Sequence, residues 1–107
     1  MALPTLDELN IMHASICQAF TDPKRILILY SLHEKPRHVT ELANFLNLPQ
    51  PTVSRHLRVL REHSLVRPER KGAAVYYHVT EERMINVVDT MRQIMRDLLE
   101  RRADILA

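Results

Sequence analysis

The 107-residue chain contains one glycine and one cysteine, and these low counts exclude several classes of protein. A single cysteine, Cys17, cannot build an intrachain disulfide framework or a cysteine-only zinc finger. A single glycine, Gly72, excludes phosphate-binding loops of the GxGxxG and GxxxxGK types. It also argues against a turn-rich all-β fold, because such turns place glycine at positive φ. The length and the ordinary composition, 46% hydrophobic and 26% charged residues, predict one globular domain over residues 1–107.

Long apolar runs are missing as well. No stretch approaches the roughly 18 apolar residues that a membrane span requires. Residues 1–10 lack the basic-then-apolar order of a signal peptide. We therefore expect a cytoplasmic protein with no membrane partner. No nucleophile–base pair, phosphate loop or pair of carboxylates at a pocket stands out, so the sequence predicts that the protein is not an enzyme.

The positive charge is concentrated in one quarter of the chain. The formal net charge is +2, but residues 1–54 and 81–107 each carry a net charge of −1. Residues 55–80 carry six cations and two anions, a net charge of +4. Arginine supplies twelve of the fifteen cations in the chain, and its planar guanidinium suits bidentate contact with phosphate or guanine. A basic segment is often only a solvated face, so its function depends on the fold that presents it.

Apolar periodicity predicts an α-helix at each end of the chain and one that follows the first. Apolar residues at steps of three and four favour a helix over 6–20 and a long helix over 81–102. A second helix runs from 24 to about 32, with Asp22 as its N-cap and Pro23 at its first position. The stripes on the two end helices have no second layer to cover them, which is typical of a dimer interface. The expected interface residues are Leu6, Leu9, Ile16, Met84, Val88, Met91, Met95 and Leu98.

The middle of the chain predicts a winged helix-turn-helix. Two short helices within 39–63 are joined by a tight connection, and 65–79 changes to two β-prone runs around Gly72, the pattern of a hairpin. The fold class is thus mainly α with a β-hairpin wing. In this plan the second of the two short helices enters the major groove of double-stranded DNA, and the hairpin tip reaches the neighbouring backbone or minor groove. The predicted DNA-binding residues are Gln50, Thr52, Ser54, Arg55, His56, Arg58, Arg70 and Lys71.

Three motifs in this order resemble the ArsR/SmtB family of bacterial winged helix-turn-helix transcriptional repressors. They are the segment from Glu41 to Glu62 (ELANFLNLPQPTVSRHLRVLRE), the upstream FTDPKRILIL and the downstream GAAVYY, and the similarity covers about residues 14–80. The resemblance implies a homodimer formed by the first and last helices. It also implies binding to a palindromic operator near a promoter, relieved by an inducer.

The sequence departs from this family at the positions where its metal and sulfide sensors carry ligands. The Cys-x-Cys pair of thiolate sensors corresponds to His38 and Thr40, and the second-helix cysteine of sulfide sensors to Tyr30. The zinc ligands of the last helix correspond approximately to Glu81, Arg83, Ile94 and Asp97, and neither arginine nor isoleucine ligates zinc. We therefore expect no cofactor, and an inducer that is either not bound by thiolates or unknown from the sequence.

Two alternatives stay open at the level of sequence. His13 and Cys17 lie four residues apart on the first helix, and with His33, His38 or a partner chain's groups they could ligate a metal. The favoured interpretation is that Cys17 packs in the dimer interface and that His13 and His38 face solvent. The second alternative is a winged helix that serves as a protein-interaction or dimerisation module without binding DNA. Such a module would not need the cationic face between residues 55 and 71.

Overall fold

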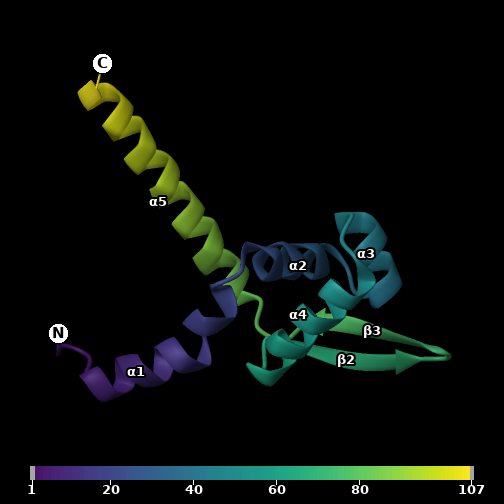
Figure 1. The fold of residues 1–107 in the computed structure, drawn as a ribbon. Coiled ribbons are helices and arrows are strands. Elements are labelled where there is room, and N and C mark those ends of the chain that lie inside the picture. The colour runs from purple at the N-terminus through teal and green to yellow at the C-terminus, as the bar shows by residue number, and fades with distance from the viewer. Residues whose placement is uncertain (1, 107) are drawn as a thin grey trace.

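The computed structural model describes residues 2–106, which form a small helical body with two projecting helices (Figure 1). No helix in this described range is long and apolar enough to cross a membrane. In chain order the elements are α1 (Leu6–Ser15), the 3₁₀ helix η1 (Cys17–Phe20), α2 (Pro23–Glu34), β1 (Arg37–His38), α3 (Val39–Leu46), α4 (Gln50–Glu62), β2 (Val66–Lys71), β3 (Ala74–Val79) and α5 (Arg83–Leu106).

Local chemistry at the N-termini explains where α2 and α3 begin. The Asp22 carboxylate accepts a hydrogen bond from the Lys24 amide at 2.9 Å, and Pro23 occupies the first turn, so the predicted cap is confirmed. The start of α3 is a capping box. The imidazole of His38 accepts from the Glu41 amide at 3.3 Å, and the Glu41 carboxylate accepts from the His38 amide at 3.5 Å.

The hairpin belongs to a three-stranded antiparallel sheet in the order β1-β3-β2. In the hairpin Val66 lies opposite Val79 and Lys71 opposite Ala74, which leaves a two-residue turn. Gly72 is the first turn residue and has φ +64, as a type II′ turn requires. The strand β1, which pairs with β3, is an element that the sequence analysis did not predict.

The core lies where α2, α3 and α4 meet the sheet and the start of α5. Its largest fully buried side chains are Ile28, Leu42, Val53, Leu57 and Leu60. Each such side chain contributes about 1.5–3 kcal/mol to folding. This core fixes α4 on the body, with one face turned inward and the other outward.

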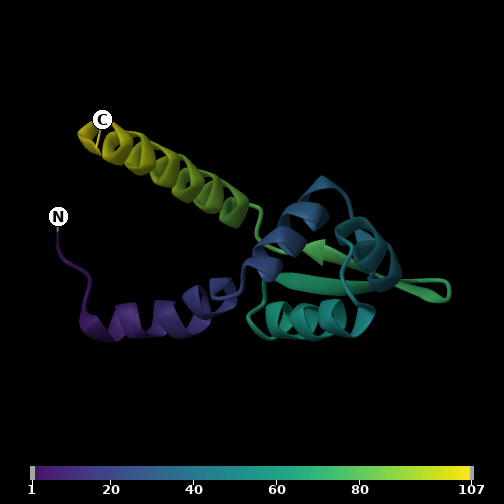
Figure 2. The ribbon, with the colours of Figure 1, turned by 45° about the horizontal axis from the view of Figure 1, so that its top comes forward.

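The helices α1 and α5 leave the body as two arms (Figures 1 and 2). None of the ten residues of α1 is buried, and in α5 the buried residues are Ile85 and Val88, near its start. The radius of gyration is 16.7 Å, against about 13 Å for a compact domain of this length. Tyr30 donates a hydrogen bond to Asp89 and thereby holds the start of α5 against α2.

The end helices differ from the sequence prediction. The predicted helix over 6–20 is interrupted at Ile16, whose φ of −121° ends α1 before η1 begins. The carbonyls of Gln18 and Ala19 accept hydrogen bonds from the Arg25 side chain, a tertiary contact that apolar periodicity does not reveal. The last helix begins two residues later than predicted, at Arg83, and continues to Leu106.

Candidate nucleic-acid interface

The helix α4 carries an exposed polar face opposite its buried one. Its 13 residues include four buried side chains, Val53, His56, Leu57 and Leu60. A cationic outward face attracts polyanions, and this one contains no acidic residue before Glu62. The exposed residues that face away from the core are Gln50, Ser54, Arg55, Arg58 and Arg61, with Thr52 partly exposed.

The N-terminus of α4 is open to a ligand. Its N-cap is Pro49, which makes no side-chain capping hydrogen bond, and the first turn holds no acidic residue. The unpaired amides and the positive end of the helix dipole favour a phosphate at this position. The connection from α3 keeps this end exposed, because Asn47 adopts a left-handed backbone with φ 53° and the Leu48 amide donates to the Ala43 carbonyl at 3.0 Å.

The wing presents a second cationic group. Arg70 and Lys71 at the end of β2 are exposed. The Glu69 carboxylate lies between the side chains of Arg67 and Lys71, at 3.4 Å from a nitrogen of each. It also lies 3.6 Å from Nε2 of His78. Partial burial raises the pKa of Glu69, but the hydrogen bonds from Arg67 and Lys71 and the charge of His78 outweigh it and hold this pKa below its usual value. The carboxylate therefore stays charged and orders the wing's side chains.

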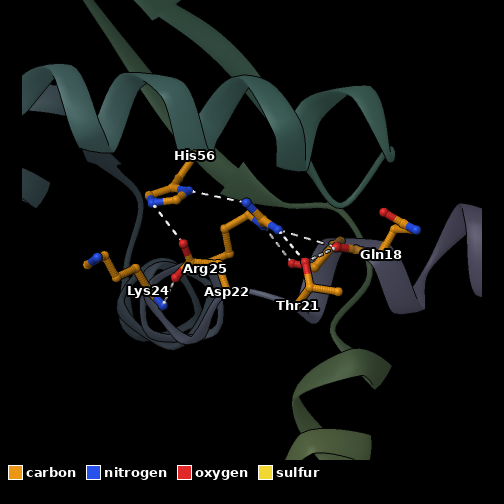
Figure 3. A network of polar contacts seen from close by, with 7 residues as sticks. Gln18, Thr21, Asp22, Lys24, Arg25 and His56 are labelled. Atoms are coloured by element: carbon orange, nitrogen blue, oxygen red, sulfur yellow. Dashed lines mark hydrogen bonds and ion pairs between the residues drawn. The ribbon is translucent and has the colours of Figure 1, made fainter.

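The prediction that His56 faces DNA is wrong. His56 is 3% exposed and lies on the inner face of α4, against the start of α2 (Figure 3). It follows Val53 by three residues and precedes Leu60 by four, so helical geometry places it with the core side chains. That spacing was available in the sequence and could have shown that His56 lies with Val53 and Leu60.

The other predicted DNA-binding residues lie on exposed surface in two groups. Residues 50–58 of α4 form one group, and Arg70 and Lys71 at the wing tip form the other. A shallow groove of about 310 Å³ lies where the start of α3 meets the wing, and its lining includes His38, Thr40 and Ala73. This groove is not predictable from the sequence, because it forms only when β1 brings the start of α3 to the sheet.

The candidate metal ligands do not form a cluster. His13 is exposed on α1, Cys17 is partly buried in η1, and His38 caps α3 and pairs with Glu41 at 3.0 Å. Within residues 2–106, no group of three or more histidine, cysteine, aspartate or glutamate side chains is arranged to hold a metal ion.

A second exposed surface lies between the two arms. An apolar groove of about 550 Å³ separates η1 and the end of α1 from the first half of α5. Of the predicted interface residues, Leu6, Met91, Met95 and Leu98 are at least half exposed. Val88 is an exception, because it is buried within its own chain at 5% exposure. The adjacent Val87 is exposed in its place. The groove is lined by Met12, Ile16, Cys17, Phe20, Met84, Val87 and Met91.

Comparison with known proteins places these features in one family. The sequence model described as "Bacterial regulatory protein, arsR family" matches residues 22–67, from the cap of α2 to the start of β2. The HTH-type transcriptional repressor SmtB of Mycobacterium tuberculosis is 37% identical over 73 residues, which cover 68% of this chain and 54% of that protein. The chain thus spans about half the length of this relative.

One further relative and one solved structure are matched over nearly the whole of their own chains. The uncharacterised HTH-type transcriptional regulator MJ1325 of Methanocaldococcus jannaschii is 30% identical over 82 residues, which cover 76% of this chain and 92% of that protein. A solution structure of the homodimeric winged helix-turn-helix DNA-binding domain (fragment 1–100) of Mb0332 from Mycobacterium bovis, a possible ArsR-family regulator, has a TM-score of 0.75. Its sequence identity is 23%, and the similarity covers 94% of this chain and 95% of that one, which shows the winged helix-turn-helix fold.

Proposed function

Because the chain belongs to the ArsR family of bacterial DNA-binding transcriptional regulators, we propose that it acts as a repressor that binds a palindromic operator as a homodimer. The observation that carries this proposal is the exposed face of α4, which combines arginines with hydrogen-bonding side chains and is held outward by a buried apolar face. A helix of 13 residues is about 20 Å long and fits the major groove, which is about 12 Å wide.

The side chains of α4 have distinct roles in this proposal. Gln50 can pair with adenine, and Arg55 or Arg58 with the acceptor edge of guanine. The hydroxyls of Thr52 and Ser54 can donate to a base or to a phosphate. The open N-terminus of α4 holds a backbone phosphate and so fixes the depth of the helix in the groove.

The wing contributes affinity rather than sequence preference. Arg70 and Lys71 lie at the tip of the hairpin and contact the neighbouring backbone or minor groove. Contacts between cations and phosphates release counterions, so affinity falls steeply as salt rises.

Dimerisation explains why the operator is a palindrome. The apolar groove between the arms and the exposed stripe on α5 bind a second copy of the chain, which covers the surface that one copy leaves exposed. A two-fold axis then presents two copies of α4 to half-sites one helical turn, about 34 Å, apart. Derepression does not use a Cys-x-Cys metal site within one chain, because Cys17 is the chain's one cysteine.

Two alanine variants test the assignment of roles. A duplex is first selected from a random library with the wild-type protein. Arg55→Ala is expected to weaken binding to this duplex by about 1–3 kcal/mol and to relax the base preference at one position of each half-site. Arg70→Ala is expected to weaken binding to the selected duplex and to a scrambled duplex by the same factor. Fluorescence anisotropy at several salt concentrations measures both effects.

The control is Arg83→Ala, which removes a cation that is 84% exposed at the start of α5 and paired with Glu81. It should bind both duplexes as the wild type does. If Arg55→Ala binds the selected duplex as well as the wild type, α4 is not the recognition helix. If the wild type shows no binding to random duplex at low salt, the chain is instead a protein-interaction module.

A further inference from the structure

The inner side of α4 is connected by hydrogen bonds to the segment formed by α1 and η1. His56 lies in the middle of α4 and His63 directly after its last residue. Each contributes one ring nitrogen to a connection with the N-terminal segment, and neither belongs to the outward face proposed to contact DNA. His56 is connected through Arg25 of α2.

Arg25 uses all three of its side-chain nitrogens in this connection (Figure 3). Nε donates to the Ala19 carbonyl at 2.8 Å. One terminal nitrogen donates to the Thr21 hydroxyl at 2.9 Å and to the Gln18 carbonyl at 3.3 Å. The other lies 3.3 Å from Nδ1 of His56. The guanidinium thus joins the end of η1 to the centre of α4.

The contact with Arg25 fixes the protonation state of His56. A guanidinium can only donate, so Nδ1 of His56 accepts and the proton of the neutral ring is on Nε2. Nε2 then faces the Asp22 carboxylate, the N-cap of α2, at 3.6 Å. Burial lowers the pKa of His56, Asp22 opposes this, and the positive charges of Arg25, Arg55 and Lys24 lower the pKa further. The neutral ring that this geometry requires is therefore the stable form at neutral pH.

A second hydrogen bond connects the same two segments. Nδ1 of His63 lies 2.8 Å from the carbonyl oxygen of Ser15, the last residue of α1, and donates to it. The segment between these two contacts, η1, also lines the apolar groove through Cys17 and Phe20. The proposed dimer surface and the recognition helix are thus bridged by two side-chain contacts, of which the one through Arg25 has the larger number of hydrogen bonds.

We propose that Arg25 is a positioning residue for DNA recognition: through His56 it sets the orientation of α4 relative to η1, and hence relative to the dimer partner. The proposal rests on the proposed function, since it concerns the operator-binding geometry of the dimer. It predicts that loss of this contact changes the alignment of two recognition helices on one operator. Contacts of a single helix with unspecific phosphates do not depend on that alignment.

The test compares Arg25→Ala with Lys24→Ala. The second variant removes the same charge from the neighbouring residue, which is exposed. Both are measured against the duplex selected by the wild type and against a scrambled duplex of equal length. We expect Arg25→Ala to bind the selected duplex at least tenfold more weakly and the scrambled one within twofold of the wild type. Lys24→Ala should stay within twofold on both.

Substitutions at His56 provide the matching evidence from the other side of the contact. His56→Gln keeps a side-chain oxygen that can accept from Arg25, whereas His56→Leu keeps volume and loses the acceptor. The proposal is supported if His56→Gln keeps part of the wild type's preference for the selected over the scrambled duplex and His56→Leu does not. Arg25→Lys, which keeps the charge but not the fork of donors, should resemble Arg25→Ala, and it replaces that variant if Arg25→Ala does not fold.

Hydrogen exchange separates failure of this proposal from failure of the proposed function. Amides of residues 50–62 should exchange at least tenfold faster in Arg25→Ala or Arg25→Lys than in Lys24→Ala, whether or not DNA binds. Equal exchange in these variants overturns the proposal, and so does an equal loss of affinity for both duplexes, which would make Arg25 a phosphate contact. A wild type that selects no duplex refutes the proposed function, while the exchange data still decide whether Arg25 orients α4.

Discussion

Three residues in the described part of the chain have a left-handed backbone, and they differ in how well they tolerate it. Gly72 at the wing turn has φ +64, Asn47 after α3 has φ 53 and Ser64 after α4 has φ 61. Glycine adopts this conformation at no steric cost, and asparagine is the next most tolerant residue. Ser64 has neither advantage, and its position is stabilised by contacts around it, such as the hydrogen bond from Thr80 to its carbonyl.

We expect Ser64→Gly to stabilise the protein by about 0.5–1 kcal/mol, because relief of the left-handed strain exceeds the added entropy of the unfolded chain. The midpoint of thermal unfolding, measured at fixed protein concentration, should rise by a few degrees. The opposite substitution, Gly72→Ala, serves as a matched comparison, since a Cβ there meets no atom within 4 Å and only the backbone is strained. It should lower the midpoint by a similar amount. A lower midpoint for Ser64→Gly would contradict the prediction.

The buried His56 makes stability depend on pH in a defined direction. Burial lowers its pKa in the folded protein, whereas in the unfolded chain histidine titrates near its ordinary value of about 6.5. Below that value the unfolded state binds more protons, so the free energy of unfolding falls as pH drops from about 7 towards 5. Urea unfolding at several pH values should show this decrease in the wild type.

His56→Gln is the control for this pH dependence, because it removes the titrating group and keeps the other five histidines. Its free energy of unfolding should fall less steeply between pH 7 and 5 than that of the wild type. Equal slopes in the two proteins would show that His56 is not the group responsible.

At the scale of elements, α1 is the helix with the least support from its own chain. It has ten residues, a cap at Thr5 that accepts from the Glu8 amide at 3.1 Å, and no buried side chain. An isolated helix shorter than about 12–15 residues is only marginally stable in water. In the proposed dimer, α1 gains stability from the surface that it covers on the second copy.

We expect the protection of α1 amides against hydrogen exchange to depend on protein concentration. Dilution below the dimer dissociation constant should increase exchange in residues 6–15 and in the outer half of α5. Exchange in α2, whose Ile28 is fully buried in the core, should stay unchanged until the whole domain unfolds. Protection of α1 that is independent of concentration would mean that packing within one chain suffices to hold it.

At the scale of the whole molecule, the proposed dimer depends on the two arms. Met95 is 52% exposed on the apolar side of α5, while Gln93 lies on the opposite side and donates to Asp97. Met95→Lys is expected to shift the protein from dimer to monomer in sedimentation equilibrium, because a charge in an apolar interface is costly. Binding to the selected duplex should weaken at least tenfold, since one half-site then binds alone.

The matched control is Gln93→Lys, which adds the same charge to the other face of the same helix. It should remain dimeric and retain its affinity for the duplex. Monomeric Gln93→Lys, or dimeric Met95→Lys, would show that the interface lies elsewhere on the molecule.

Features that depend on residues close together in the chain could be predicted from the sequence. Asp22 and Pro23 start α2, Gly72 forms the wing turn, and the spacing of Val53, Leu57 and Leu60 gives α4 one apolar and one cationic face. These features follow from capping, from backbone sterics and from helical periodicity, all of which act within a few residues. The fold class and most of the candidate DNA-binding face follow from them.

Features that depend on residues far apart in the chain form only when the chain packs into its tertiary structure. The strand β1 exists because Arg37 pairs with Tyr77, and α1 ends at Ser15 where Arg25 binds the carbonyls that follow. His56 lies on the buried face by helical spacing, but its polar neighbours, Arg25 and Asp22, come from the start of α2. A local pattern records which residue types share a face, but the partner that meets that face comes from a distant segment and is fixed only when the chain packs.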